Sequence, residues 1–231
     1  MNEILIIPDI HGRTFWETAL SYQGKIVFLG DYTDPYPHEG ITQENAYFAF
    51  SEIVRFKQQH PDRVTLLIGN HELHYYDRQF QASRFSEEYY NKYHAVLTGE
   101  KSAGLFQLCK QMDNYLFIHA GITKGWYDLH KTELQSLGDD LETQVNRLFL
   151  NNKQAFYEVS GERGGWSRYG SPVWADAHEF FCEQEPFQKD IIQIIGHTQI
   201  GNNEPVIRKN IRLLDNQQLY LLRNGQIEHY V

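Results

Sequence analysis

The amino-acid sequence predicts an α/β fold with a functional site at the carboxyl ends of its strands. Short runs of aliphatic, β-branched and aromatic residues recur along the chain, each too short for a helix: residues 3–7, 25–29, 64–68, 115–118 and 190–195. A one-sided helical pattern separates the second run from the third. Acidic, amide or imidazole side chains follow every run, which is where open α/β sheets place their sites.

Length and composition restrict the class of protein. A chain of 231 residues with 41% hydrophobic residues suits a single domain, here 1–231, with helical insertions expected around 73–114 and 123–165. The net charge of −9 argues against nonspecific nucleic-acid binding. Cys109 and Cys182 have no CxxC spacing and are expected to be buried thiols. No run approaches the length of a membrane span, so we expect a cytoplasmic protein, while its oligomeric state stays open.

The first run, residues 3–7, leads through Pro8 into Asp9 and His11. An aspartate and a histidine two positions apart beyond a strand can both reach one site. Arg13 follows, and residues 14–20 have the pattern of a helix.

The second run is closed by Gly30 and leads into two carboxylates, Asp31 and Asp34. Two acids at the end of an apolar strand are costly unless a cation compensates them, and carboxylate oxygens suit hard divalent cations. The alternative is a helix cap or an Asx turn, which aspartate after glycine often forms.

The next elements repeat this arrangement. Residues 35–40 form a loop by their prolines and glycine, and Thr42 is expected to cap a helix that runs to about His60. The third run, residues 64–68, then ends in Gly69 followed by Asn70, His71 and Glu72.

The segment 73–114 differs because tyrosine and phenylalanine alternate with charges in it. We expect one or two helices there, whose aromatic residues either lie over the site or pack the segment onto the core. Residues 115–118 form the fourth run, which His119 follows.

In the second long segment, 123–165, Asp139 and Glu142 resemble a capping box. Leu141, Val145 and Leu148 share the apolar face of the helix that follows. The fifth run, 190–195, ends before His197, and the tail 219–231 has a hairpin turn at Asn224-Gly225.

Five strand ends therefore deliver a set of metal-binding side chains. Each of these strand-end motifs alone is weak evidence for a metal site, but five of them in one chain indicate a common site. Mixed carboxylate, imidazole and amide donors suit two divalent ions such as Mn²⁺, Fe or Zn²⁺. A shared carboxylate would hold such ions roughly 3.5–4 Å apart. The set is Asp9, His11, Asp31, Asp34, Asn70, His71, His119 and His197.

The ordered motifs DIH (9–11), GDYTD (30–34), GNHE (69–72), IHAG (118–121) and GHTQ (196–199) resemble the calcineurin-like metallophosphoesterase superfamily. They are similar to its phosphoprotein phosphatase branch and to bacterial diadenosine-tetraphosphatases. The resemblance implies two mixed β-sheets packed face to face and flanked by helices, with a dinuclear metal site at the strand ends. It also implies that Gln199 stands where many members have a further histidine.

The same resemblance assigns roles to residues. Asp9, His11 and Asp31 would hold the first metal ion, and Asp31 would bridge to a second ion completed by Asn70, His119 and His197. His71 matches the histidine that donates a proton to the leaving group, and Asp34 matches the acid that orients this histidine.

One position departs from the phosphatase branch. That branch usually reads GDxxDRG, with the arginine gripping the substrate phosphate, whereas this chain has Pro35-Tyr36 after Asp34. Arg168, in the sequence WSR, matches a second phosphate-binding arginine of the bacterial members, and Arg13 lies beside the DIH motif. Both are expected to bind substrate.

The predicted function is metal-assisted hydrolysis of phosphate monoesters, with phosphoserine and phosphothreonine proteins among the candidate substrates. A water activated by two metal ions would attack phosphorus, and His71 would protonate the departing oxygen. One alternative is symmetrical hydrolysis of dinucleoside polyphosphates, for which the tyrosines of 75–93 could form a stacking platform. Another is a protein-binding scaffold without catalysis, but such a chain should lack a metal ligand or the histidine donor.

Overall fold

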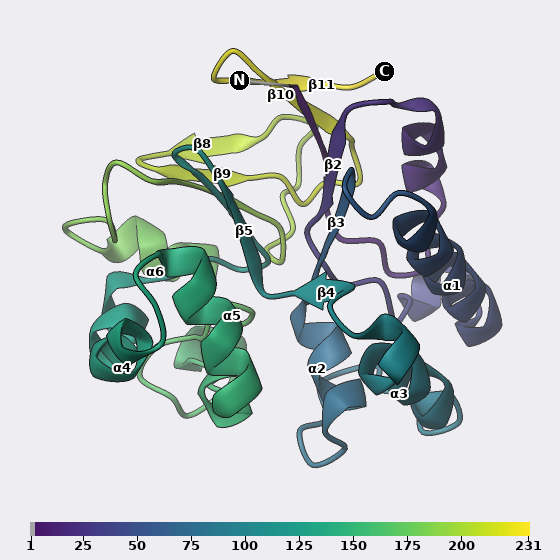
Figure 1. Ribbon diagram of the computed structural model, residues 1–231, viewed down its shortest axis with the longest axis horizontal. Helices are drawn as coiled ribbons and strands as arrows, with labels where there is room; N and C mark the ends of the chain where they lie inside the picture. Colours follow the sequence, from purple (N-terminus) through teal and green to yellow (C-terminus); the bar gives the residue numbers. More distant parts are fainter. Residues whose placement is uncertain (1–2) are drawn as a thin grey trace. The chain divides into compact units, whose positions relative to one another are not determined.

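The computed structural model describes residues 3–231, which divide into two compact units. Unit 1 contains the described residues up to Phe106 together with Gln217–Val231, and unit 2 contains Gln107–Asn216. Each unit is built on one mixed β-sheet with helices beside it (Figure 1). The predicted pair of mixed sheets with flanking helices is therefore confirmed.

The sheet of unit 1 has six strands in the order β11-β10-β1-β2-β3-β4. The three central strands β1, β2 and β3 are parallel, whereas β10 and β11 run antiparallel at one edge. Parallel strands end at the same edge of a sheet, so the residues after β1, β2 and β3 come together. The strands are β1 (Ile4–Ile7), β2 (Lys25–Phe28), β3 (Val64–Leu67), β4 (Phe106–Gln107), β10 (Tyr220–Arg223) and β11 (Gln226–His229).

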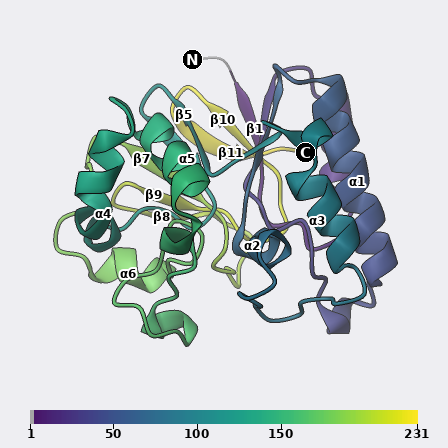
Figure 2. The ribbon, with the colours of Figure 1, turned by 60° about the horizontal axis from the view of Figure 1, so that its bottom comes forward.

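Three α-helices belong to unit 1: α1 (Gln43–Gln59), α2 (Asn70–Tyr76) and α3 (Tyr90–Thr98). Thr42 caps α1 as predicted, because its hydroxyl accepts the Asn45 N–H at 3.1 Å. Helices α1 and α3 lie side by side, and Phe50 and Tyr93 meet between them with ring centroids 5.4 Å apart (Figure 2). Both residues belong to the apolar core that covers one face of the sheet.

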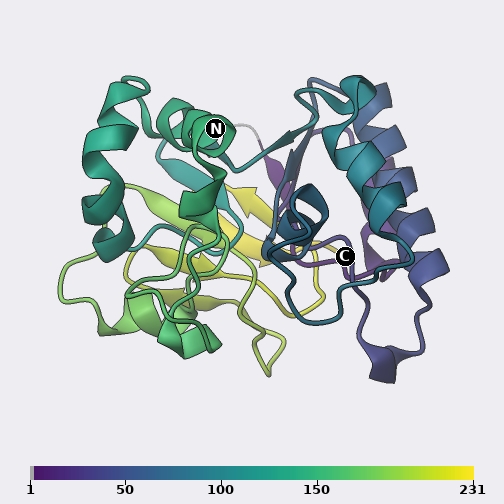
Figure 3. The same cartoon turned by 90° about the horizontal axis from the view of Figure 1, so that it is seen from below.

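The sheet of unit 2 has five strands in the order β5-β6-β7-β9-β8. The strands β6, β7 and β9 are parallel, and β5 and β8 are antiparallel to their neighbours. Helices α4 and α5 lie side by side in this unit (Figure 3). The elements are β5 (Cys109–Met112), β6 (Tyr115–Ile118), β7 (Ile192–Ile195), β8 (Val206–Arg208), β9 (Ile211–Leu213), α4 (Lys124–Ser136), α5 (Leu141–Asn151) and α6 (Ala177–Cys182).

Several local predictions need correction. The helix predicted at 14–20 is a 3₁₀ helix, Phe15–Ser21. Helix α5 is capped by Asp140 rather than Asp139, since the Asp140 carboxylate accepts the Thr143 N–H at 2.8 Å. Glu142 does not complete a capping box and instead accepts the Gln111 N–H at 2.8 Å.

Other elements were not anticipated. Helix α4 begins after Thr123, whose side chain accepts the Trp126 N–H. The strands β4, β5 and β8 and helix α6 were also missed, because they are too short for their periodicity to show. Cys109 is buried as expected, whereas Cys182 is exposed at the end of α6. No helix among the described residues is long and apolar enough to cross a bilayer.

Candidate metal centre

The three parallel strands of unit 1 place four predicted metal ligands at one edge of the sheet. Asp9 and His11 follow β1, Asp31 follows β2, and Asn70 begins α2 just after β3; all four are buried. The loops after β1 and β2 are joined directly, because the His11 N–H donates to the Asp31 carbonyl at 2.8 Å. The prediction that these strand ends converge is thus correct for unit 1.

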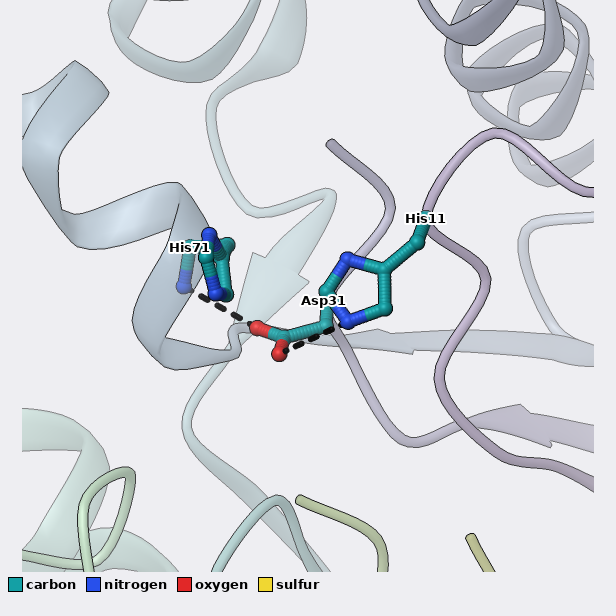
Figure 4. Close-up of side chains that lie close together, drawn as sticks. All are labelled: His11, Asp31 and His71. Atoms are coloured by element: carbon teal, nitrogen blue, oxygen red, sulfur yellow. Dashed lines mark hydrogen bonds and ion pairs between the residues drawn. The ribbon is translucent and has the colours of Figure 1, made fainter. Parts of the chain in front are cut away.

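The His11 ring is held in the form that binds metals. Its Nδ1 donates to the Thr33 carbonyl at 2.9 Å, which leaves Nε2 with a lone pair 3.5 Å from Asp31 Oδ2 (Figure 4). Burial, reinforced by the charges of His71 and Arg84, keeps the pKa of His11 well below its usual value, so the ring is neutral. Two electron-pair donors that face each other without a proton between them suit a divalent cation.

Backbone strain marks the same residues. His11, Asp31 and Asp34 have φ angles of +47°, +52° and +56°, and His197 in unit 2 has +66°. The left-handed region costs a residue other than glycine about 1–2 kcal/mol and tends to persist at functional sites. The packing around these side chains therefore holds them in conformations that the chain would not adopt alone.

Asp34 is the centre of a buried hydrogen-bond network. It accepts from His71 Nδ1 at 2.8 Å and from the Tyr75 hydroxyl at 2.5 Å, and His74 Nε2 lies 2.6 Å from the same carboxylate. Because His74 Nδ1 accepts the Ala82 N–H, its proton is on Nε2 and points at Asp34. Burial alone would raise the pKa of Asp34, but the bonds from His71 and His74 hold it below its usual value.

This network orients His71. With Nδ1 bound to Asp34, the other ring nitrogen, Nε2, contacts Arg84 at 2.8 Å, and the ring packs against the His11 ring with centroids 5.0 Å apart. The predicted pairing of His71 with Asp34 is therefore present. His74 and Tyr75 were not predicted to support it, although three- and four-residue spacing from His71 places them on neighbouring faces of one helix.

Glu72 holds the loop after β2 through hydrogen bonds to its backbone. Its fully buried carboxylate accepts the backbone N–H groups of Gly69, Asp31 and Tyr32 at 2.8, 2.9 and 2.9 Å. Burial raises the pKa of Glu72 to about 7, and these N–H groups oppose that rise by stabilising the charged form. Glu72 thus ties the start of α2 to the loop after β2.

Unit 2 contributes two further predicted ligands. His119 follows β6 and His197 follows β7, and these strands are adjacent and parallel. Their Nε2 and Nδ1 atoms lie 3.1 Å apart, and both residues are buried. Two imidazole nitrogens this close have the arrangement of two ligands to one ion.

The two predicted substrate-binding arginines differ in their surroundings. Arg13 is buried in unit 1, and its Nε and Nη2 donate to the Glu39 carboxylate at 2.9 and 2.8 Å. Arg168 is exposed in unit 2, with its guanidinium 5.2 Å from the centroid of the Tyr169 ring. A role in phosphate binding stays a prediction for both. A third arginine, Arg84, lies 2.8 Å from the His71 ring and was not anticipated.

The aromatic segment packs into the protein core. Tyr75, Tyr89 and Tyr93 are buried in the apolar cluster of unit 1, where the Tyr75 and Tyr93 rings are 4.5 Å apart. Of the two predictions for 73–114, packing onto the core is confirmed for these tyrosines. Buried rings offer no face on which a nucleotide base can stack.

Comparison with known proteins finds phosphatases that are similar in sequence or in fold. The catalytic subunit of serine/threonine-protein phosphatase 4 from Candida glabrata is 25% identical over 182 residues, which are 76% of this chain and 50% of that protein. The chain thus spans about half the length of this curated relative. A solved cold-active protein tyrosine phosphatase aligns with 99% of this chain and 78% of its own, at 15% identity and a TM-score of 0.61. A serine/threonine phosphatase from Saccharomyces cerevisiae with similarity to human phosphatase PP5 aligns with 99% of this chain and 79% of its own, at 14% identity and a TM-score of 0.51.

The sequence profile of calcineurin-like phosphoesterases matches residues 3–209. This range includes every strand end that carries a candidate ligand, and the His11–Asp31 and His119–His197 pairs have the donor atoms that a metal-dependent hydrolase needs. The protein therefore belongs to the calcineurin-like phosphoesterase family.

Proposed function

We propose that this protein is a metal-dependent phosphatase for phosphate monoesters, with His71 as the general acid. The observation that carries the proposal is the 2.8 Å hydrogen bond between His71 Nδ1 and Asp34. It fixes the ring so that Nε2 points away from Asp34; Nε2 accepts from Arg84 Nη2 at 2.8 Å in this structure and can carry a proton once that contact is released. A proton held there can pass to the oxygen of a departing alcohol, the step that limits hydrolysis of a monoester with a basic leaving group.

The donor chemistry supports the proposed metal-binding residues. The neutral His11 ring and the Asp31 carboxylate fit a divalent ion, and the proposed set mixes carboxylate, imidazole and amide donors, which favours Mn²⁺, with Fe or Zn²⁺ as alternatives. When bound, two such ions neutralise phosphate charge and activate water. Asp9, His11 and Asp31 would hold one ion, and Asn70, His119 and His197 the other, with Asp31 shared.

Other residues of the proposed site support proton transfer, loop position and substrate binding. Asp34 keeps a negative charge behind His71, which favours the protonated ring at the moment it gives up its proton. Glu72 positions the backbone of Asp31, and Arg168 and Arg13 are proposed to contact the substrate. These roles require no group other than the metal ions.

Monoesters are favoured over dinucleoside polyphosphates as substrates. A dinucleotide needs aromatic faces for its bases, and three of the five tyrosines in 75–93, namely Tyr75, Tyr89 and Tyr93, are buried in the core. A phosphoserine or phosphothreonine side chain needs only phosphate contacts and an acid for its alkoxide, which His71 would supply.

The test is metal reconstitution followed by a substrate panel. Protein stripped by chelation should lose turnover, regain it with Mn²⁺, and contain two ions per chain by elemental analysis. The panel compares an aryl phosphate, a phosphoserine peptide and diadenosine tetraphosphate, and turnover should be highest on the monoesters. Full activity in protein shown to be metal-free would refute the proposal, and preferred cleavage of the dinucleotide would favour the alternative substrate class.

Single variants then test which residues bind the ions. His119→Ala and His197→Ala should each reduce the bound metal from two ions to one, because both are proposed ligands of the same ion. Asp31→Asn should weaken both sites at once. Gln199→Ala is the matched control and should keep two ions; equal damage from this change would mean that the ligand set is wrongly assigned.

A further inference from the structure

Arg84 lies in the proposed site although it belongs to no metal-binding motif. It stands in the connection between α2 and α3, is partly buried, and has a φ angle of +66°. Arginine has no special preference for the left-handed region, unlike asparagine, aspartate or histidine. Its φ angle lies in the same left-handed region as those of His11, Asp31 and Asp34.

The Arg84 guanidinium is placed by two contacts. Its Cζ lies 3.6 Å from the centroid of the Tyr36 ring, a stacking distance, and its Nη2 lies 2.8 Å from His71 Nε2. The Tyr36 ring in turn meets the edge of the His11 ring, with centroids 5.0 Å apart. Arg84 therefore faces the general acid and stands beside a metal ligand at the same time.

The positive charge of Arg84 has no acidic partner among the described residues. Arg13 is paired with Glu39, and Arg78, in the same connection as Arg84, is paired with Glu87, each at 2.8 Å. Within residues 3–231 no carboxylate lies within ion-pair distance of Arg84, and its Nε and Nη1 are buried without a hydrogen-bond partner. A partly buried cation with two unused, buried donors is costly, and an anion with several acceptor oxygens would satisfy it.

We propose that Arg84, held against Tyr36, binds the phosphate group of the substrate. This inference rests on the proposed phosphatase function. It names a phosphate-binding arginine for a chain that has Pro35-Tyr36 where an arginine usually follows the second aspartate. Tyr36 brings no charge itself, but its ring supports an arginine that comes from a distant part of the sequence. Phosphate oxygens accept two parallel N–H bonds from one guanidinium, so a single arginine can provide the grip.

Binding of inorganic phosphate to the Mn²⁺-loaded enzyme tests the proposal directly. The inhibition constant of inorganic phosphate, measured with an aryl phosphate as the substrate, should rise roughly 10- to 150-fold in Arg84→Ala. This range corresponds to the loss of a hydrogen bond to a charged group. Arg84→Lys should recover part of this loss, because it restores the charge without the fork of donors. Tyr36→Leu should raise the same constant roughly 2- to 10-fold by removing the stacking contact. Arg78→Ala is the matched control and should bind phosphate as the wild type does.

A second measurement separates phosphate binding from support of His71. If Arg84 grips phosphate, Arg84→Ala should lose kcat/KM equally on alkyl and aryl phosphates, since both carry the same phosphate group. A loss confined to alkyl phosphates would show that Arg84 positions His71 instead. Bound metal, measured by elemental analysis, should stay at the wild-type content, and its loss would also overturn the inference.

The outcomes remain distinct from those of the proposed function. An unchanged phosphate inhibition constant in a well-folded Arg84→Ala or Arg84→Gln variant refutes the role of Arg84 and leaves the phosphatase intact. A wild-type enzyme that hydrolyses no monoester after metal loading refutes the function itself. Should Arg84→Ala fail to fold, as judged by circular dichroism, Arg84→Lys and Tyr36→Leu answer the same question, and wild-type phosphate binding in both would end the proposal.

Discussion

Replacing Glu72 by glutamine should remove a large part of the stability of unit 1. The carboxylate receives three short backbone hydrogen bonds, from Gly69, Asp31 and Tyr32, and glutamine can accept with one oxygen only. The two retained hydrogen bonds then have an uncharged acceptor, so each contributes about 1 kcal/mol less to the unfolding free energy. The third backbone N–H faces the amide NH₂ and loses its acceptor, which costs about 1–3 kcal/mol. The expected loss of unfolding free energy is therefore about 3–5 kcal/mol.

Urea denaturation of metal-free protein measures this loss through the transition midpoint at constant slope. Glu52→Gln is the matched control, because Glu52 pairs with Arg55 on the exposed side of α1, and it should change the unfolding free energy by less than about 0.5 kcal/mol. Glu72→Gln should also bind Mn²⁺ more weakly, since the backbone of Asp31 loses its anchor. A destabilisation below about 1 kcal/mol would show that the Glu72 carboxylate does not hold this loop.

Three further predictions concern catalysis. His71→Asn should keep two bound metal ions and lose roughly 10²–10⁴-fold in kcat on an alkyl phosphate. Its loss on a nitrophenyl phosphate should be clearly smaller, because that leaving group needs no proton. Equal losses on both substrates, together with a missing metal ion, would show that His71 is structural. Tyr75→Phe removes the hydroxyl that donates to Asp34, and should lower the unfolding free energy by about 1.5–3 kcal/mol and show the same leaving-group bias in milder form. A Tyr75→Phe enzyme with wild-type stability and kinetics would contradict the network around Asp34. Arg168→Ala should raise KM and lower kcat for every monoester, and wild-type kinetics would remove Arg168 from the substrate site.

The convergence of the proposed ligands within unit 1 was predictable because it depends on local patterns. Each ligand follows a short apolar strand, and parallel pairing of β1, β2 and β3 brings those strand ends to one edge of the sheet. Sequence features with a strong local cause were equally readable. The hydroxyl of Thr42 caps α1, and Asn224-Gly225 turns the chain between β10 and β11 with both φ angles positive.

Residues that act through long-range contacts could not be predicted in this way. Arg84 follows His71 by thirteen positions, and only the path of the chain from α2 to α3 brings the two together. No periodicity encodes that path. Tyr75 was grouped with the other aromatic residues of 73–114. The sequence around it does not distinguish a tyrosine that only packs in the core from one that also donates to a buried carboxylate. The cap of α5 was misplaced by one residue because Asp139 and Asp140 are adjacent and equally suitable.

The short helix α2 explains how so many groups of the site are held at once. Successive residues of a helix point about 100° apart, so His71 and Tyr75 share one direction and Glu72 points elsewhere. The first two contact Asp34, and Glu72 reaches back to the loop after β2. Asp31 returns the contact, since its Oδ1 accepts the His71 N–H at 3.0 Å. Because α2 and the β2 loop fix each other through bonds in both directions, the orientations of the proposed general acid, His71, and of the proposed metal ligand, Asp31, are not independent. A substitution that breaks the hydrogen bonds between α2 and the loop after β2 should therefore weaken both metal binding and proton transfer, in whichever segment it is made.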